Sequence, residues 1–241
     1  MSNLSDKMAS VLITRYNIRA NFIGSDKSSL NLDNKWLAHR RDLFNRYCLP
    51  SVRHQSLTNF TWFVMFDPDT PAEYYDYLDG VITPVFARSQ QEAHDKINTS
   101  LESFEYCVST RLDNDDALEK SHLFRAREIA FAGINSSMSM PHVINFRSGA
   151  DYDVIKRKLF LRDYPTSNFF SLVSDRSGGE KLRFATEFHH VNVFKELDNF
   201  NIKTLDPMWL IAIHDQNVGN TVHGTKEVGT DMLQSLFGIE A

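Results

Sequence analysis

Three carboxylates crowd into the middle of this chain, in the segment Asp113-Asn114-Asp115-Asp116. The stretch before it, residues 104–112, is apolar and partly β-branched and predicts a buried strand, while residues 118–132 after it predict a helix. Carboxylates held this close at a strand end repel one another unless a cation neutralises them. Because hard divalent cations take oxygen ligands, and open α/β sheets bind ligands at the carboxyl ends of their strands, we expect a metal and diphosphate site here. A structural alternative stays open, in which the carboxylates, Asp116 above all, cap the helix that follows.

The elements that must position this segment alternate regularly in the first half of the chain. The sequence predicts strands over 9–14, 60–66, 81–86 and 104–112 and helices over 33–48, 72–78 and 89–103. Such alternation indicates βαβ units and a mostly parallel sheet. Pro84 indicates that the 81–86 strand lies at a sheet edge or that the proline lies at a strand end.

The second half changes character. Strand-like runs over 136–146, 152–161, 169–173 and 182–193 are separated by turn-forming residues, which favours an antiparallel or mixed extension of the sheet. Asp206 and Pro207 predict a helix start just before Trp209, and residues 223–241 predict an amphipathic terminal helix. We expect one domain over 9–222 with residues 223–241 as a C-terminal tail, which can pack on its own core or on a second copy in a homo-oligomer.

Composition limits the class of protein. The chain has 241 residues, and its hydrophobic content of 42% is typical of a globular protein. Its net charge of −5 does not favour binding to nucleic acid, so we expect no nucleic-acid partner. The two cysteines, Cys48 and Cys107, lie in apolar segments without metal-type spacing and predict buried free thiols. With no apolar stretch of membrane-spanning length, we expect a cytoplasmic protein, a location compatible with peripheral contact at the inner membrane face.

Four blocks of the sequence together resemble one family. They are Trp36-Leu37-x-x-Arg40-Arg41 with its continuation to Ser51, the block 62–71 that contains Asp67, the segment Thr110 to Leu118, and Met208-Trp209-Leu210-x-x-Ile213-His214-x-x-Asn217. The acidic segment resembles the DxD motif of GT-A glycosyltransferases, and the whole set resembles the rhamnosyltransferase family of bacterial proteins. The resemblance covers residues 9 to about 220 and implies a GT-A fold, that is, an α/β protein with a mixed sheet flanked by helices.

The resemblance also implies an activity. The protein would move a sugar, rhamnose by the family's name, from a nucleotide-diphosphate donor to a glycan or lipid-linked acceptor in polysaccharide biosynthesis, with inversion. A divalent metal, Mn²⁺ or Mg²⁺, would stabilise the leaving diphosphate, with Asp113, Asp115 and His214 as its ligands. Asp113 would also lean toward the ribose, and Asn217 would orient His214 or contact the diphosphate.

Further residues are candidates for the nucleotide itself. Arg15, Tyr16 and Asn17 follow the first strand, where Tyr16 can stack on the base and Arg15 can meet a phosphate. Asp67 is a candidate for base or ribose. Arg88 and Arg111 are candidates for phosphate or acceptor, although a salt bridge from Arg111 to Asp113 explains that arginine equally well.

An inverting enzyme needs a general base for the acceptor hydroxyl. The segment Glu187-Phe188-His189-His190 is the densest titratable cluster after the acidic segment, and we expect Glu187 to be the base, with His190 second. A Glu–His pair that serves only the structure is the alternative.

Two other functions remain open at this stage. The same carboxylates would serve a metal-dependent nucleotidyltransferase or phosphotransferase, although Gly24 stands alone and residues 11–20 contain no lysine. A catalytically inactive glycan-binding module of the same fold is the second alternative.

Overall fold

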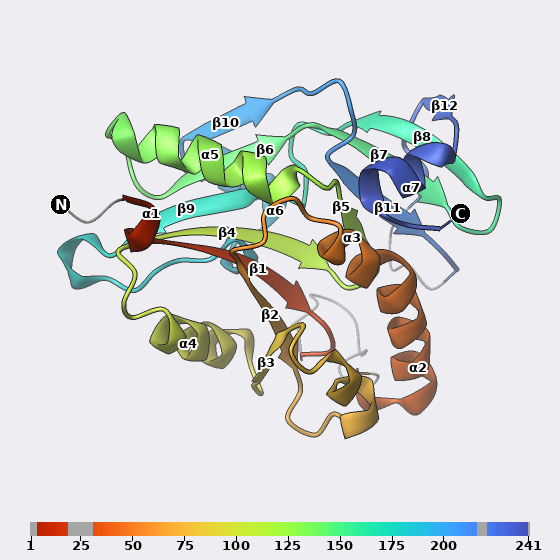
Figure 1. Cartoon of the computed structure of the whole chain (residues 1–241), viewed down its shortest axis with the longest axis horizontal. Coiled ribbons are helices and arrows are strands. Elements are labelled where there is room, and N and C mark those ends of the chain that lie inside the picture. Colours follow the sequence, from red (N-terminus) through yellow and green to blue (C-terminus); the bar gives the residue numbers. More distant parts are fainter. Residues whose placement is uncertain (1–3, 19–30, 216–220, 241) are drawn as a thin grey trace.

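The chain folds around a seven-stranded mixed sheet, whose strands are laid out from β10 at one edge to β3 at the other in Figure 1. The structure is a computed structural model, and it describes residues 4–18, 31–215 and 221–240. The strand order is β10-β6-β9-β4-β1-β2-β3. Its members are β1 (Met8–Arg15), β2 (Thr61–Phe66), β3 (Thr83–Phe86), β4 (Tyr106–Asp113), β6 (His142–Phe146), β9 (Ser171–Asp175) and β10 (Asn199–Ile202).

The four strands of the first half are parallel, as the sequence predicts, and β3 with Pro84 forms the sheet edge. Strand β9 runs antiparallel to both β4 and β6, so the second half extends the sheet in a mixed fashion. The mixed α/β fold class is thereby confirmed.

A second sheet of five strands has the order β12-β8-β7-β11-β5. It contains β5 (Ala117–Leu118), β7 (Ser148–Asp153), β8 (Lys158–Asp163), β11 (Trp209–Ile213) and β12 (Lys226–Val228). Strand β5 begins one residue after Asp116 and pairs with β11. The acidic segment therefore spans the junction between the two sheets.

Helices cover both faces of the large sheet, because its buried strands are apolar on both sides. On β1, Met8 and Leu12 face one hydrophobic cluster, while Val11 and Ile13 face another. The first cluster is covered by α2 (Asn34–Leu43), a π-helical turn (Phe44–Cys48), α3 (Leu49–Arg53) and α5 (His122–Asn135), and the second by α4 (Gln90–Ser100). In Figure 1, α4 and α5 accordingly lie on opposite sides of β4.

Several local signals work as predicted. The side chain of Asp33 accepts the amide of Trp36 and caps α2, and Ser89 caps α4 in the same way. Both cysteines are buried and free. The C-terminal helix α7 (Asp231–Phe237) buries Leu233 and Phe237 against the second sheet of its own chain. Short 3-10 turns occupy Ala72–Tyr74, Asp76–Leu78, Ser177–Gly179 and Ala185–Glu187, and a short helix α1 (Leu4–Lys7) precedes β1.

Other predictions of local structure are wrong. The helix expected after Asp206 is strand β11, because Trp209–Ile213 is held between β7 and β5 and is almost wholly buried there. The helix expected from residue 118 begins at His122, after β5. The 152–161 run is split by a turn between β7 and β8, the 136–146 run is a strand only from His142, and 182–193 holds a 3-10 turn and α6 (His190–Glu196).

No described helix has the length and apolar character needed to cross a lipid bilayer.

Candidate active site

Two arginines hold the first aspartate of the acidic segment. The parallel pairing of β1 and β4 puts Arg15 directly opposite Asp113, and Arg15 Nη2 lies 3.0 Å from Asp113 Oδ1. Arg111, on the same strand, lies 3.5 Å from Oδ2, so the predicted salt bridge is present. Burial alone would raise the pKa of Asp113, but the charges of Arg15 and Arg111 outweigh it and hold that pKa well below its usual range. Asp113 is therefore a carboxylate at any physiological pH.

The second aspartate, Asp115, is paired with Arg40 and His214. Arg40 Nη1 lies 2.5 Å from Asp115 Oδ2, and His214 Nε2 lies 3.1 Å from the same oxygen. Arg40 comes from α2, and His214 follows the end of β11. Asp115 and His214, predicted to share a site, thus lie in direct contact although 99 positions separate them.

The remaining members of the acidic segment anchor the backbone. Asn114 donates to the carbonyl of Tyr16 at 2.7 Å, and Asp116 accepts the amide of Ala212 at 3.0 Å. Burial, followed by repulsion from Asp115 and Asp113, raises the pKa of Asp116 well above its usual range. Helix α5 has Ser121 at its N-cap position, so the acidic segment does not cap that helix, and this structural alternative is wrong.

Beside Asp115 lies a group of potential metal ligands. One ligand atom each of His39, His214 and Asp215 lies within 4.8 Å of the others. The rings of His39 and His214 meet edge-to-face at a centroid distance of 5.3 Å. The buried Nε2 of His39 has no hydrogen-bond partner within the described part of the chain. These residues supply two nitrogens and one carboxylate, a donor set that fits a divalent transition metal.

The residues after β1 serve the structure more than the sequence suggested. The ring of Tyr16 is only 2% exposed and packs against Phe44 and Phe66, so it presents no face for stacking on a base. Asn17 is also buried, and its amide nitrogen donates to Thr70 at 2.8 Å. Of the three residues predicted to bind the nucleotide here, Arg15 meets the acidic segment through its side chain, whereas the contact of Tyr16 with that segment is through its backbone carbonyl.

Asp67 and Arg88 lie beyond the ends of β2 and β3. Asp67 is fully buried, and its carboxylate accepts from Asn31 at 3.2 Å and from the amide of Asp69 at 2.9 Å, so it organises its own loop. Arg88 is exposed and pairs with Asp69 at 3.3 Å. Because an exposed ion pair contributes little stability, Arg88 can leave Asp69 and bind a phosphate instead at a small cost in free energy.

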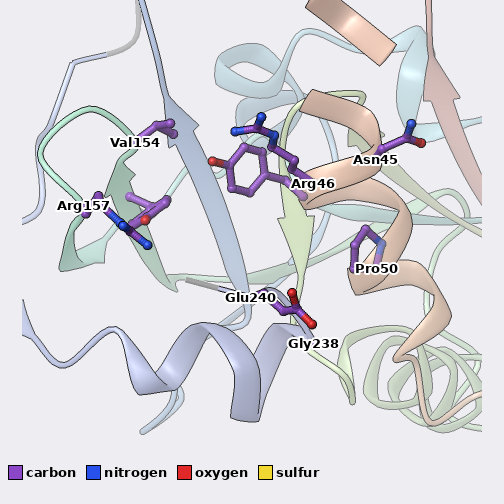
Figure 2. Close-up of a pocket in the computed structure, with 9 residues that line it drawn as sticks. Asn45, Arg46, Pro50, Val154, Arg157, Gly238 and Glu240 are labelled. Carbon is purple, nitrogen blue, oxygen red and sulfur yellow. The ribbon is translucent and has the colours of Figure 1, made fainter. Parts of the chain in front are cut away.

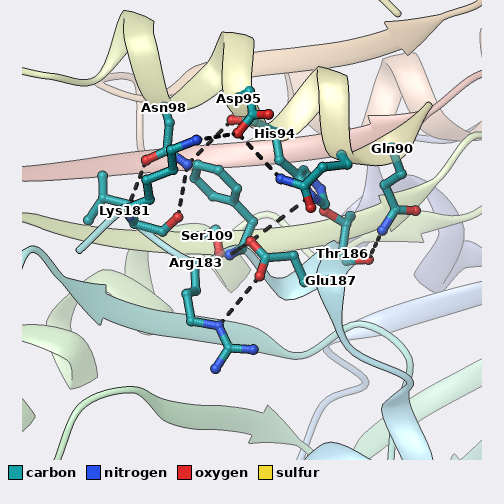
Figure 3. A network of polar contacts seen from close by, with 12 residues as sticks. Gln90, His94, Asp95, Asn98, Ser109, Lys181, Arg183, Thr186 and Glu187 are labelled. Atoms are coloured by element: carbon teal, nitrogen blue, oxygen red, sulfur yellow. Dashed lines mark hydrogen bonds and ion pairs between the residues drawn. The ribbon is translucent and has the colours of Figure 1, made fainter. Parts of the chain in front are cut away.

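Glu187 belongs to a polar network that joins α4 to residues 181–187, drawn in Figure 3. Its carboxylate accepts the amide of Phe184 at 2.8 Å and lies 3.4 Å from Arg183 and 4.0 Å from His94. His94 in turn bonds Thr186 at 2.8 Å. Burial raises the pKa of Glu187. These contacts match the structural alternative, although the histidine that pairs with Glu187 is His94 and not His190.

His190 has the tautomer that a base requires. Its Nδ1 lies 2.9 Å from the carbonyl oxygen of Thr166, and because a carbonyl only accepts, this nitrogen carries the proton. The neutral ring therefore has its lone pair on Nε2. Burial lowers the pKa of His190, the charge of Arg111 lowers it further, and that of Asp113 opposes them. Arg111 donates to the carbonyl of Phe188, two residues before His190, at 3.5 Å.

A cavity of about 730 Å³ opens between the π-helical turn, the β7–β8 turn and the end of the chain (Figure 2). Its walls include Arg46, Tyr47, Tyr152, Arg157 and Glu240. Among the described residues, none of those predicted for the donor or metal lines it.

Two residues of the site, Arg40 and His39, are consecutive residues of α2 and are not among the candidate site residues expected from the sequence. The four-residue spacing of Trp36 and Arg40 is the sequence signal that could have indicated contacts on this face of the helix. In the structure the Arg40 guanidinium lies 5.2 Å from the centroid of the Trp36 ring. The predicted Asn217 lies outside the described residues.

The comparisons with known proteins place the chain in a family. The family described as "Putative rhamnosyl transferase" matches residues 13–226. The chain therefore belongs to that family, and by family it is a transferase. No curated protein matches it significantly.

Solved structures give distant likenesses only. A "putative nucleotide-diphospho-sugar transferase" from Desulfovibrio desulfuricans G20 is 8% identical with a TM-score of 0.37, covering 82% of this chain and 80% of its own. CMP:2-keto-3-deoxy-manno-octonic acid synthetase complexed with CTP is 8% identical with a TM-score of 0.35, covering 84% and 92%. A 4-diphosphocytidyl-2C-methyl-D-erythritol synthase from Anaerococcus prevotii DSM 20548 is 11% identical with a TM-score of 0.36, covering 92% and 95%. Likenesses this distant carry no argument about activity.

Proposed function

We propose that this protein is a metal-dependent glycosyltransferase that moves a sugar from a nucleotide diphosphate to a glycan or lipid-linked acceptor, with inversion. The observation that carries the proposal is the meeting of Asp113, Asp115, Arg15, Arg40 and His214 at the carboxyl ends of β4, β1 and β11. Family membership supports the same class of reaction.

The arginines suit a diphosphate. Arg15, Arg40 and Arg111 all pair with carboxylates of the acidic segment. A guanidinium group also binds phosphate oxygens well, because its fork of N–H donors matches their geometry. When the donor's diphosphate arrives, these arginines can share or exchange their partners and so stabilise the charge that develops as the diphosphate leaves. A divalent metal held by Asp115 and His214 would supply further positive charge to stabilise the leaving diphosphate.

The acceptor hydroxyl must lose a proton while its oxygen attacks the anomeric carbon. We assign this proton to Nε2 of His190, because the Thr166 carbonyl fixes the other ring nitrogen as a donor. Arg111, which pairs with Asp113, also donates to the carbonyl of Phe188, two residues before His190. The new glycosidic bond then forms as the bond to the diphosphate breaks on the opposite face of the sugar. Glu187, expected first from the sequence, is held instead in the network around His94.

Rhamnose is the sugar that the family description favours. The test is to incubate the purified protein with MnCl₂ and a panel of nucleotide sugars that includes nucleotide-diphosphate rhamnoses. We expect slow donor hydrolysis with release of nucleoside diphosphate, and calorimetric binding of at least one nucleoside diphosphate. If no nucleoside diphosphate binds with the metal present, the proposal fails.

The same assay separates the alternatives. A nucleotidyltransferase would release pyrophosphate from a nucleoside triphosphate, which a phosphate assay detects. An inactive glycan-binding module would bind glycans equally well after Asp115→Asn, whereas a glycosyltransferase should lose transfer in that variant.

A further inference from the structure

We infer that the cavity between the π-helical turn, the β7–β8 turn and the end of the chain (Figure 2) binds an anionic saccharide, that is, a sugar ring that carries a carboxylate or a phosphate. The inference rests on the proposed function in one respect, since it makes this saccharide a part of the acceptor. At about 730 Å³ the cavity lies within the range of about 300–1,000 Å³ that is usual for small-molecule sites.

Two buried tyrosines give the cavity hydrogen-bonding groups in fixed positions. The rings of Tyr47 and Tyr152 meet edge-to-face at a centroid distance of 6.2 Å, and the two residues are only 5% and 4% exposed. Neither phenol oxygen makes a hydrogen bond within the described residues, and neither is sealed from solvent. Burial raises the pKa of Tyr47, so its hydroxyl keeps its proton at physiological pH. Both hydroxyls are therefore available to a ligand in the cavity.

The rest of the wall combines donors with an acceptor. Oδ1 of Asn45 accepts the hydroxyl of Tyr77 at 3.0 Å, which leaves the amide nitrogen of Asn45 for a ligand. Arg46 and Arg157 add guanidinium donors, and Glu240 adds a carboxylate acceptor. Because each sugar hydroxyl both donates and accepts, this lining suits a saccharide better than an apolar ligand.

The charges favour an anionic group on that saccharide. The guanidinium of Arg157 makes no ion pair with any described residue. Arg46 pairs with Asp42 at 3.0 Å, in an exposed contact that a ligand can replace at a small cost in free energy. Glu240 offsets one of the two guanidinium charges, so the lining keeps a positive charge in a chain whose net charge is −5. A guanidinium binds a carboxylate or a phosphate through two parallel hydrogen bonds.

The backbone at Arg157 supports a role for its side chain. Its φ of +55° lies in the left-handed region, which glycine adopts freely and other residues adopt at a cost. The turn, which the pair Asp153 and Lys158 closes, would therefore form at least as well with glycine at position 157. The arginine side chain is thus not required by the turn itself.

The cavity also borders the elements that carry partners of the acidic segment. The amide of Val154 donates to the carbonyl of Ile213 at 3.0 Å, and His214 is the next residue. The π-helical turn continues α2, which carries Arg40. A saccharide in the cavity is therefore held next to these elements, as a part of the acceptor should be.

The experiment measures binding of single sugars to the full chain by ligand-observed nuclear magnetic resonance, without donor or metal. The probes are two uronic acids, glucuronic and galacturonic acid, and the 6-phosphates of glucose and mannose. Each is compared with its neutral parent sugar and with inorganic phosphate. We expect at least one anionic sugar to bind at least about tenfold more tightly than its parent sugar and than phosphate.

The outcome also identifies the anionic group. Binding of the uronic acids alone would assign a carboxylate, and binding of the sugar phosphates alone would assign a phosphate. The inference is overturned if no anionic sugar binds, if the neutral sugars bind as tightly, or if inorganic phosphate binds as tightly as the sugar phosphates.

Variants locate the binding in this cavity. Arg157→Gly removes the guanidinium and suits the left-handed backbone, so it should be no less stable in urea than the wild type and should bind the anionic sugar at least about tenfold more weakly. Tyr152→Phe removes only a hydroxyl and should also weaken binding. Arg125→Ala, which removes an exposed arginine of α5, is the control and should leave binding unchanged. Wild-type binding in both Arg157→Gly and Tyr152→Phe would contradict the inference.

A competition experiment separates this inference from the proposed function. A nucleoside diphosphate with Mn²⁺ should not displace the anionic sugar, and displacement would put the donor in the cavity and overturn the inference. If only the inference is wrong, no anionic sugar binds but a nucleoside diphosphate still binds with Mn²⁺. If only the proposed function is wrong, the anionic sugar binds through Arg157 and no nucleoside diphosphate binds.

Discussion

At the scale of single residues, the site is built from charges that neutralise one another across the sheet junction. Asp113 has two arginine partners and Asp115 has an arginine and a histidine. Ion pairs of this kind, partly shielded from water, hold their geometry better than exposed pairs. A charged ligand can therefore enter by exchanging partners within a preformed arrangement.

The choice between the two candidate bases can be tested with two variants. His190→Gln should lower kcat for transfer by about 10²- to 10⁴-fold, because it removes the proton acceptor, and should leave binding of nucleoside diphosphate nearly unchanged. Glu187→Gln should lower stability, since it weakens the contacts with Phe184 and Arg183, and should keep most of kcat. Transfer that survives in His190→Gln and is lost in Glu187→Gln would reverse the assignment.

The pH dependence of transfer follows from the same histidine. The base must be unprotonated, and burial lowers the pKa of His190 below its usual 6.5, while Arg111 and His189 lower it further and Asp113 and the Thr166 carbonyl oppose them. The rate should therefore be near its plateau at pH 7 and fall only as the pH drops below about 6.5. A kcat profile against pH checks this, and an acid limb centred above pH 7 would contradict it.

At the scale of elements, β11 decides how the acidic segment is placed. It lies between β7 and β5, its Ala212 amide binds Asp116, and His214 follows its end. The indole of Trp209 lies flat over Gly149 of β7 and donates to the carbonyl of Phe146 at 2.7 Å. Close packing of β7 against β11 therefore helps to fix the positions of Asp116 and His214.

Gly149→Ala should disturb this packing. A Cβ at Gly149 would lie 2.2 Å from two atoms of the Trp209 ring, which is fully buried and has little room to move. We expect a loss of about 1–3 kcal/mol or more in the free energy of unfolding, measured by urea denaturation. Gly178→Ala is the control, since nothing lies within 4 Å of its Cβ and only its φ of +70° costs energy, about 1 kcal/mol. A smaller loss for Gly149→Ala than for Gly178→Ala would contradict the packing argument.

At the scale of the whole molecule, buried neutral histidines link parts of the chain that are far apart in sequence. His94 joins α4 to Thr186, and His122 joins the start of α5 to the carbonyl of Met208. Burial lowers the pKa of each of these histidines to about 4. Both are nearly inaccessible to solvent and cannot be protonated in place without loss of stability.

Stability should consequently fall with acidification. In the unfolded chain each of these histidines is protonated below a pKa of about 6.5, whereas in the folded chain it stays neutral down to about pH 4. Between these two pH values, each histidine therefore lowers the free energy of unfolding by up to about 3 kcal/mol. Urea denaturation at pH 7 and pH 5 measures the effect. His94→Gln should unfold with a weaker dependence on pH than the wild type, and an unchanged dependence would contradict the argument.

The sequence by itself determined the types of chemistry and much of the first half of the fold. Apolar runs of strand length, the caps Asp33 and Ser89, and Pro84 at an edge are local signals, and local steric and hydrogen-bonding preferences act wherever the chain places them. The close spacing of the Asp113 and Asp115 carboxylates likewise predicts that they need positively charged partners.

Only the tertiary structure decided which groups meet that need. Asp206 and Pro207 signal a helix, yet pairing with two neighbouring strands makes Trp209–Ile213 a strand, because non-local hydrogen bonds and burial outweigh local propensity. Arg40 reaches Asp115, and His39 reaches His214, only because the fold brings α2 next to these residues. His190 gains its tautomer from a carbonyl of another loop. Contacts between residues so far apart in sequence leave no periodic trace in it, so the candidate ligands and the candidate base could be found only in the folded chain.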